Sequence, residues 1–80
     1  MYTINYNIDH EHWEEYNFYF NSIWAATFKA RAICIEHWAD VDVIDRNTGV
    51  VLVSFNRAGG YYVDEELPED IKKLASLSIK

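Results

Sequence analysis

The segment from residue 39 to residue 55 constrains the fold of this chain most strongly. Two runs rich in Val and Ile, residues 39–45 and 50–55, flank the polar residues 46–49. Two such runs around a short polar segment that ends in glycine are typical of a β-hairpin. Gly49 can adopt the positive φ of a bulged turn, and the Asp45 side chain can accept turn amides. We therefore expect two antiparallel strands here.

The first residues of the chain alternate between two kinds of side chain. Apolar or aromatic side chains at every second position are separated by polar ones: Tyr2, Ile4, Tyr6 and Ile8 against Thr3, Asn5 and Asn7. A period of two predicts a strand with one buried face. Residues 15–20 also alternate, which predicts a second strand and a hairpin through residues 9–12. A short helix from Asp9 is the alternative, because Trp13, Tyr16 and Phe20 have helical spacing; Tyr and Phe favour the strand.

Residues 22–38 contain no Gly or Pro and four alanines, which predicts a long helix with Asn21 as its N-cap. At about 100° per residue, one side of this helix gathers the residues expected to face the core: Phe20, Trp24, Thr27, Cys34, Ile35 and Trp38. Arg31 falls on the same side, so we expect a salt bridge to Asp40 or Asp42, or a stem that reaches water. Lys29 and Glu36 point outward. Ala26, Ala30 and Ile33 lie near them and are candidates for a helix-mediated homodimer.

The C-terminal part is expected to close the domain. Residues 58–60 break the chain, and residues 61–63 are long enough for a short edge strand. Pro68 suits the first turn of a helix, and the acidic residues 69 and 70 favour a helix start. Four residues form a narrow apolar stripe on this helix: Ile71, Leu74, Ala75 and Ser78.

These elements predict an α+β fold in ββαββ order, with a short C-terminal helix. A single compact domain, residues 1–80, contains one antiparallel sheet of about four strands that packs against the long helix. The other face of the sheet is expected to be polar and acidic, and to display Thr3, Asn5, Asn7, Glu15, Asn17, Tyr19, Asp40 and Asp42.

The acidic residues are unevenly distributed. Thirteen Asp and Glu against seven Lys and Arg give a net charge of −6, and nine of the thirteen lie in two runs without a base. The first run is Asp9, Glu11, Glu14 and Glu15; the second is Asp64, Glu65, Glu66, Glu69 and Asp70. This charge disfavours nucleic acid and anionic membranes as direct ligands, since both require clustered Lys and Arg. It favours a basic partner surface, which an opposite field attracts.

The patterns expected of enzymes and metal sites are incomplete. His10 and His12 could share one side of an extended segment, but nothing in the sequence fixes a third and a fourth ligand. Cys34 and His37 lack the further ligands of a zinc site, and no serine has the glycine-flanked context of a nucleophile. We therefore expect no enzymatic activity, no metal and no cofactor. The single cysteine and the lack of a signal-peptide pattern predict a reducing, cytoplasmic location.

A very short, acidic, cysteine-poor chain with a helix on an antiparallel sheet resembles the anti-CRISPR type of protein, the small phage- and mobile-element-encoded inhibitors of bacterial defence. The stretch 39–49 looks like a hairpin common in small phage proteins. The resemblance implies non-enzymatic, stoichiometric binding to a defence complex in the cytoplasm of the host bacterium, often at a basic nucleic-acid groove.

On this hypothesis, carboxylates replace the phosphates of the nucleic acid and tyrosines supply aromatic anchors. The expected partner-binding residues are Asp9, Glu11, Glu14, Glu15, Tyr19, Asp40, Asp42, Tyr61, Tyr62, Asp64, Glu65 and Glu66. The alternative is a homo-oligomeric structural or accessory phage protein that associates through the helix or through the strand at residues 50–55. A third hypothesis is a small metal-dependent module around His10 and His12.

Overall fold

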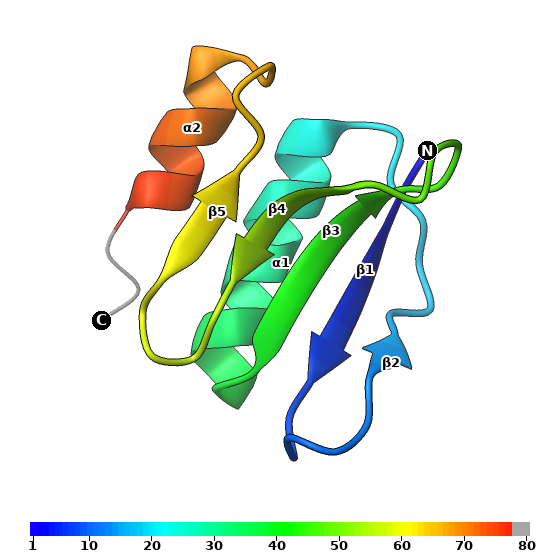
Figure 1. Ribbon diagram of the computed structural model, residues 1–80, viewed down its shortest axis with the longest axis vertical. Coiled ribbons are helices and arrows are strands. Elements are labelled where there is room, and N and C mark those ends of the chain that lie inside the picture. Colours follow the sequence, from blue (N-terminus) through cyan, green and yellow to red (C-terminus); the bar gives the residue numbers. More distant parts are fainter. Residues whose placement is uncertain (78–80) are drawn as a thin grey trace.

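The computed structural model describes residues 1–77, which form five strands and two helices. The elements are β1 (Tyr2–Asn7), β2 (Glu14–Glu15), α1 (Ile23–His37), β3 (Asp40–Asp45), β4 (Val51–Phe55), β5 (Tyr61–Val63) and α2 (Glu69–Ser76). The strands form one antiparallel sheet in the order β2-β1-β3-β4-β5 (Figure 1). The predicted α+β class is confirmed, with five strands in place of about four.

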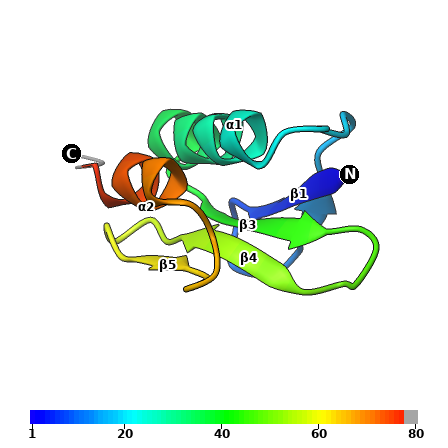
Figure 2. The same ribbon diagram turned by 90° about the horizontal axis from the view of Figure 1, so that it is seen from above.

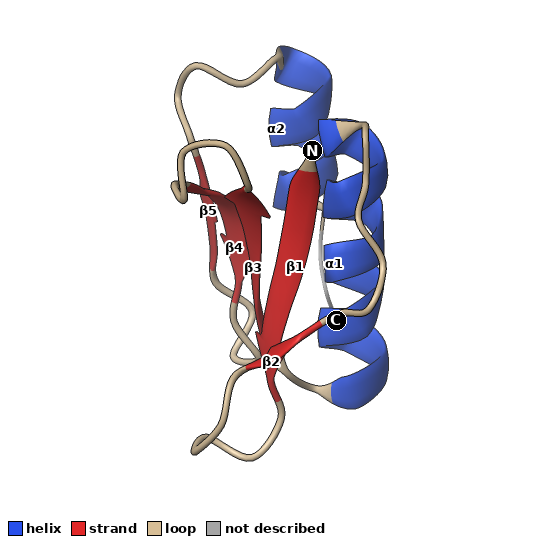
Figure 3. Ribbon diagram, turned by 90° about the vertical axis from the view of Figure 1, so that its right-hand side faces the viewer, coloured by secondary structure: helices blue, strands red, loops and turns tan. Residues whose placement is uncertain are grey.

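Both helices lie on the same face of the sheet, and the opposite face is left open (Figures 2 and 3). The register explains which side chains are covered. Ile4 is paired with Val43, and Val43 is paired with Val53, so these three side chains point to the helical face, where they are fully buried. α1 lies over β1 and β3, while α2 packs beside it against β5. The core therefore lies between one sheet face and two helices.

The predicted hairpin between β3 and β4 is confirmed. Gly49 has a φ of 77°, and its amide donates to the carbonyl oxygen of Asp45 over 2.7 Å. The side chain of Asp45 accepts from the amide of Asn47 over 2.8 Å. Further along the ladder the register shifts between Val43 and Ile44, where β4 contains one extra residue, Leu52.

The predicted first hairpin is present, but its second strand, expected over residues 15–20, is interrupted. β2 consists only of Glu14–Glu15, and it is followed by a separate bridge between Phe20 and Tyr2. Asn5 pairs with Glu15, so an unbroken ladder would place residue 18 opposite Tyr2. The chain reaches Tyr2 two residues later, and residues 17–19 bulge out of the ladder as a result. The alternative helix from Asp9 is also wrong, because this segment is a turn.

The predicted long helix is present, but its cap and its buried face differ from the expectation. Ser22, not Asn21, is the N-cap, and its hydroxyl oxygen accepts from the amide of Ala25 over 3.2 Å. The buried residues of α1 are Ala26, Thr27, Ala30, Ile33 and Cys34. The centre of this face lies roughly a quarter of a turn from the predicted one, at about 100° per residue.

One expectation fails with that rotation. The proposed dimer face of Ala26, Ala30 and Ile33 is buried against the sheet. Of the two carboxylates considered for Arg31, Asp40 binds Arg57 and Asp42 accepts a hydrogen bond from Ser54. Small residues on the inner side let α1 lie close to the sheet, so the larger side chains are left outside.

The C-terminal elements agree with the prediction. β5 pairs with β4, and α2 begins after Pro68 with Glu69 and Asp70 in its first turn. Ile71, Leu74 and Ala75 are buried as expected, whereas the predicted fourth member of the stripe, Ser78, lies outside the described residues. Within residues 1–77, neither helix has the length and apolarity needed to span a membrane.

Candidate functional site: the open face of the sheet

A row of five polar side chains crosses the open face from one edge strand to the other. The pairs Glu15–Asn5, Asn5–Asp42, Asp42–Ser54 and Ser54–Tyr62 place one residue of each strand in register. Side chains of directly paired residues point to the same face, and here the neighbouring residues point into the core. We call Glu15, Asn5, Asp42, Ser54 and Tyr62 the polar row. Four strand spacings of about 4.8 Å give it a length of roughly 19 Å.

The centre of the polar row is fixed and its two ends are open. The Ser54 hydroxyl donates to Oδ1 of Asp42 over 2.7 Å, and both side chains are half-buried. Glu15 at one end is exposed, as is Tyr62 at the other, which is 52% exposed. A rigid polar centre with accessible carboxylate and aromatic ends is suited to contact with another polar surface.

Arg57 joins three separate segments at one edge of this face. Its Nη2 donates to the carbonyl oxygen of Asn7 over 2.6 Å, and its Nη1 donates to that of Ile8 over 2.8 Å. Its Nε lies 3.4 Å from Oδ1 of Asp40, which also accepts the Arg57 amide over 3.0 Å. We call this set of contacts the Arg57 clamp. The side chain of Arg57 is 12% exposed, so the clamp is largely sheltered from water.

The Arg57 clamp determines the charge state of Asp40. Burial pushes the pKa of Asp40 upward, but the hydrogen bonds and the positive charge of Arg57 outweigh it and hold the pKa below its ordinary value. Asp40 is therefore ionised and neutralised by its own chain. Its contribution to an external partner is smaller than the sequence suggested.

The first acidic run forms the turn between β1 and β2. Oδ1 of Asp9 accepts the amides of Glu11 and His12 over 2.9 and 3.0 Å. These backbone hydrogen bonds, the one to His12 first, lower the pKa of Asp9 to about 2. His10 has a φ of 69°, and its amide donates to the buried Asn7 side chain over 2.6 Å. Asp9 thus stabilises the turn, while Glu11 is exposed beside it.

At the other end of β1, an aromatic contact borders the open face. The guanidinium carbon of Arg46 lies 3.8 Å from the centre of the Tyr19 ring, and the Tyr19 hydroxyl lies 3.5 Å from Oε1 of Glu15. Tyr19 therefore connects the β3–β4 turn to the end of the polar row. It is 41% exposed, as an aromatic interface residue needs to be.

The predicted partner-binding residues fall into three groups in space. Glu15, Asp40, Asp42 and Tyr62 lie on the open face, with Tyr19 at its border. Asp9, Glu11 and Glu14 belong to the β1–β2 connection beside it. Asp64, Glu65 and Glu66 lie in the β5–α2 loop at the opposite end of the molecule (Figure 1). Tyr61 pairs with Phe55 and so points to the helical side of β5. The structure does not unite the two acidic runs.

The positive charges lie mainly on the other layer. Within residues 1–77, four of the six Lys and Arg are on helices: Lys29, Arg31, Lys72 and Lys73. The remaining two, Arg46 and Arg57, contact Tyr19 and Asp40. The open face is therefore acidic and the helical layer carries the lysines, a separation that follows from the topology and not from the order of residues.

The predicted metal-ligand residues are arranged differently from the sequence hypothesis. His12 approaches Asp9 and Glu11, with ligand atoms within 4.8 Å of one another, while Nε2 of His10 lies 3.1 Å from Nη1 of Arg57. Asp9, Glu11 and His12 are all exposed. The Asp9 carboxylate already accepts the hydrogen bonds of the turn. Cys34 is buried, and burial is the main cause that raises the pKa of its thiol. It behaves as a core side chain.

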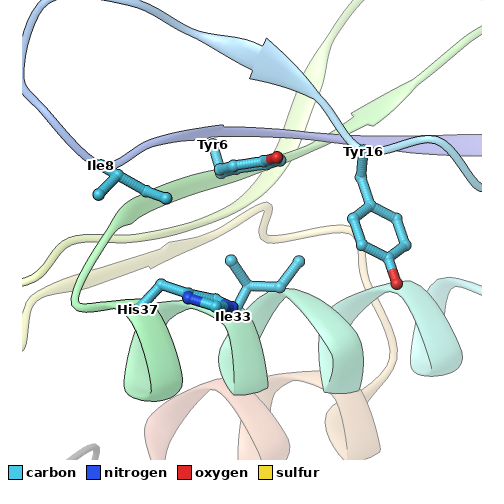
Figure 4. A pocket seen from close by; sticks show the side chains of 5 residues that line it. All are labelled: Tyr6, Ile8, Tyr16, Ile33 and His37. Carbon is cyan, nitrogen blue, oxygen red and sulfur yellow. The ribbon is translucent and has the colours of Figure 1, made fainter.

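A small pocket lies between the β1 edge and the C-terminal half of α1 (Figure 4). Its volume is about 110 Å³, and it is lined by Tyr6, Ile8, Tyr16, Ile33 and His37. The lining is mostly apolar, and the Tyr16 ring is further covered by Nζ of Lys29 at 5.5 Å. The pocket is large enough for one small apolar side chain, and it lies on the helical side, away from the polar row.

Two features of the site were not identified from the sequence. Ser54 shares its face with Asp42 because of the hairpin register, and its position between the apolar residues Val53 and Phe55 was the signal for it. Arg57 had no such signal, since its partners lie 17, 49 and 50 positions away.

Comparison with known proteins gives no match: no protein-family model, no curated protein and no solved structure is significantly similar to this chain.

Proposed function

We propose that this protein is a non-enzymatic binding module that docks its open sheet face onto a basic surface of another protein or nucleoprotein complex. The observation that carries the proposal is the polar row, in which Glu15 and Asp42 are displayed on a face where the guanidinium of Arg57 is already paired with Asp40. Carboxylates on a rigid sheet can take the place of phosphates opposite Lys and Arg.

The chemistry of the face supports binding and not catalysis. The Ser54 hydroxyl is bound directly to the Asp42 carboxylate, whereas an activated serine is bound to a general base such as an imidazole. Tyr62 and Tyr19 flank the row, and tyrosine is enriched at interfaces because it offers both an apolar ring and a hydroxyl.

We propose further that the partner is a nucleic-acid-binding defence complex of a bacterial host, and that the protein is an inhibitor of the anti-CRISPR type. Its small size, its net charge of −6 and its acidic sheet face support this. The test is to add the protein to purified RNA-guided nuclease complexes and to measure their DNA binding. Unchanged DNA binding at a large molar excess over each complex contradicts this finer proposal.

The open-face proposal is tested by pull-down from a bacterial lysate with two matched variants. Glu15→Gln with Asp42→Asn removes two charges from the polar row, and Asn at position 42 can still accept the Ser54 hydrogen bond. Glu65→Gln with Glu66→Gln removes two charges from the distant β5–α2 loop. We expect the first variant to lose captured proteins that the wild type retains, and the second to keep them.

Salt provides the second readout. Raising the salt from roughly 50 to 500 mM shortens the Debye length to about 4 Å and is expected to slow association with any captured partner. Equal losses for the two double variants contradict the open face as the site. Association rates that do not respond to salt contradict the electrostatic mechanism.

A further inference from the structure

The outward side of α1 is apolar. Trp24, Phe28 and Ile35 lie on one face of the helix, at intervals of four and seven residues, and they are 44%, 53% and 42% exposed. Trp24 stacks on Phe28 with ring centroids 5.2 Å apart. Trp38 follows the last helical residue and is 69% exposed. We call Trp24, Phe28, Ile35 and Trp38 the α1 outer patch.

The α1 outer patch is large for a domain of this size. At about 200 Å² per large side chain, the exposed fractions correspond to roughly 400 Å² of apolar surface. That equals the largest patch of a typical monomer, which is often an interaction site. In Figure 2, the side of α1 that points away from the sheet is not covered by α2.

The area suits association with a second copy. Homodimer interfaces are about 65% apolar, so roughly 400 Å² of apolar surface belongs to an interface of about 600 Å² per protomer. The total of about 1,200 Å² is the lower limit for a specific, stable interface. Small alanines assist, because Ala32 lies one turn from both Phe28 and Ile35 and permits close approach of two helices.

Charged residues lie on both flanks of the patch. The half-buried Arg31 lies on one flank, between Trp24 and Trp38 in helical phase. Lys29 and Glu36 lie on the opposite flank, seven residues apart, and their charges favour one orientation. In a parallel pair of helices Lys29 meets its own copy, which is repulsive. In an antiparallel pair related by a two-fold axis near Ala32, Lys29 meets Glu36 of the second copy, and Phe28 meets Ile35 in the same way. The patch is thus self-complementary, as a two-fold interface requires.

We propose that two copies of this chain associate through their α1 outer patches, with the helices antiparallel and crossing at Ala32. Trp24 and Phe28 of one copy pack against Ile35 and Trp38 of the other, and two Lys29–Glu36 pairs border the contact. The interface lies on the helical layer, so this inference does not depend on the proposed function of the open face.

Sedimentation velocity between about 5 and 500 μM tests the proposal. We expect the mass to rise from 9.4 kDa to twice that value, with a dissociation constant in roughly the micromolar range for an interface of this size. Ala32→Arg places like charges at the two-fold axis and is expected to raise the dissociation constant about tenfold or more. Far-UV circular dichroism establishes that this variant is folded.

A charge exchange tests the orientation. Lys29→Glu and Glu36→Lys each create a like-charge pair across the antiparallel interface, and each is expected to weaken association roughly threefold to tenfold. The double variant restores both pairs and is expected to recover wild-type association. Tyr62→Ser, on the open face, serves as the control and leaves association unchanged.

Four results overturn the proposal. If the protein remains monomeric at about 500 μM, the α1 outer patch does not bind a second copy and its partner is of another kind. Association that Ala32→Arg does not weaken, or that Tyr62→Ser abolishes, places the contact elsewhere. A double charge variant weaker than both single variants excludes the antiparallel arrangement.

Discussion

Replacing Arg57 with alanine removes the Arg57 clamp, and its effect on stability can be worked out from the contacts. Two short hydrogen bonds, to the carbonyl oxygens of Asn7 and Ile8, are lost together with the contacts to Asp40 at 3.4 Å. A hydrogen bond from a charged group contributes about 1.5–3 kcal/mol. The Asp40 side chain is 32% exposed, so water screens part of the ion pair and its contribution is discounted.

If each hydrogen bond is counted in the lower part of that range, at about 1.5–2 kcal/mol, and the screened ion pair is left out, the expected loss is about 3–4 kcal/mol. A domain of this length has a stability of roughly 4–12 kcal/mol. Each kcal/mol of lost unfolding free energy lowers the Tm of a domain of this size by about 4–8 °C. Arg57→Ala is therefore expected to lower the Tm by roughly 12–30 °C. Thermal unfolding followed by circular dichroism measures this directly. Arg46→Ala is the control, because Arg46 is exposed and its side chain stacks on the Tyr19 ring, and the loss of this contact is expected to cost less than about 1 kcal/mol.

Acid unfolding gives an independent readout of the same clamp. The folded-state pKa of Asp40 lies below its unfolded value, so this group contributes stability above the unfolded pKa and loses it as the pH falls below about 4. In the Arg57→Ala variant, Asp40 is still partly removed from water, but the positive charge of Arg57 that stabilised its carboxylate is gone. We therefore expect the pKa of Asp40 to rise. A Tm change no larger than that of Arg46→Ala would refute the clamp as a major source of stability.

Three further predictions concern local structure. Ser22→Ala is expected to destabilise the protein by about 1 kcal/mol, because it removes the N-cap, and Asn21→Ala by less than half of that; urea unfolding compares the two, and equal effects would contradict the cap assignment. Trp38 has a φ of 52°, so Trp38→Gly is expected to raise stability by about 1 kcal/mol; a lower Tm would show that the Trp38 ring contributes more than its backbone costs. Asp9 keeps its charge down to a pKa of about 2 when folded, against 3.8 as the ordinary value, so its turn is stabilised above pH 4 and that support is lost between about pH 4 and 2; a carbon-detected NMR titration of the Asp9 carboxyl checks this, and a midpoint near 3.8 would contradict the turn hydrogen bonds.

Local turn chemistry explains why the β3–β4 hairpin was predictable. Gly49 and Asp45 define the turn through contacts within five residues, so the sequence contains the full set of interactions. Alternation along β1 and β3 gave the two faces of the sheet for the same reason: each residue's face depends only on its neighbours.

The buried face of α1 could not be read from periodicity, because the helix is apolar on both sides. The large side chains Trp24, Ile35 and Trp38 suggested one face, while the small residues Ala26 and Ala30 form the true contact with the sheet. Size, not hydrophobicity, decided the packing, since Phe55 and Ile4 already fill the core from the sheet side. The early end of β2 was equally unpredictable. The two additional residues between β2 and the Phe20 bridge can be recognised only from the pairing with β1.

The polar row is assembled from residues 5, 15, 42, 54 and 62, one from each strand. A piece of the chain must include residues 5–62 to contain all five, since the central residues need β1, β3 and β4 and the two ends need both edge strands. A molecule in which either edge strand opens locally loses one end of the row. If the proposed function holds, binding through this face therefore requires the complete sheet.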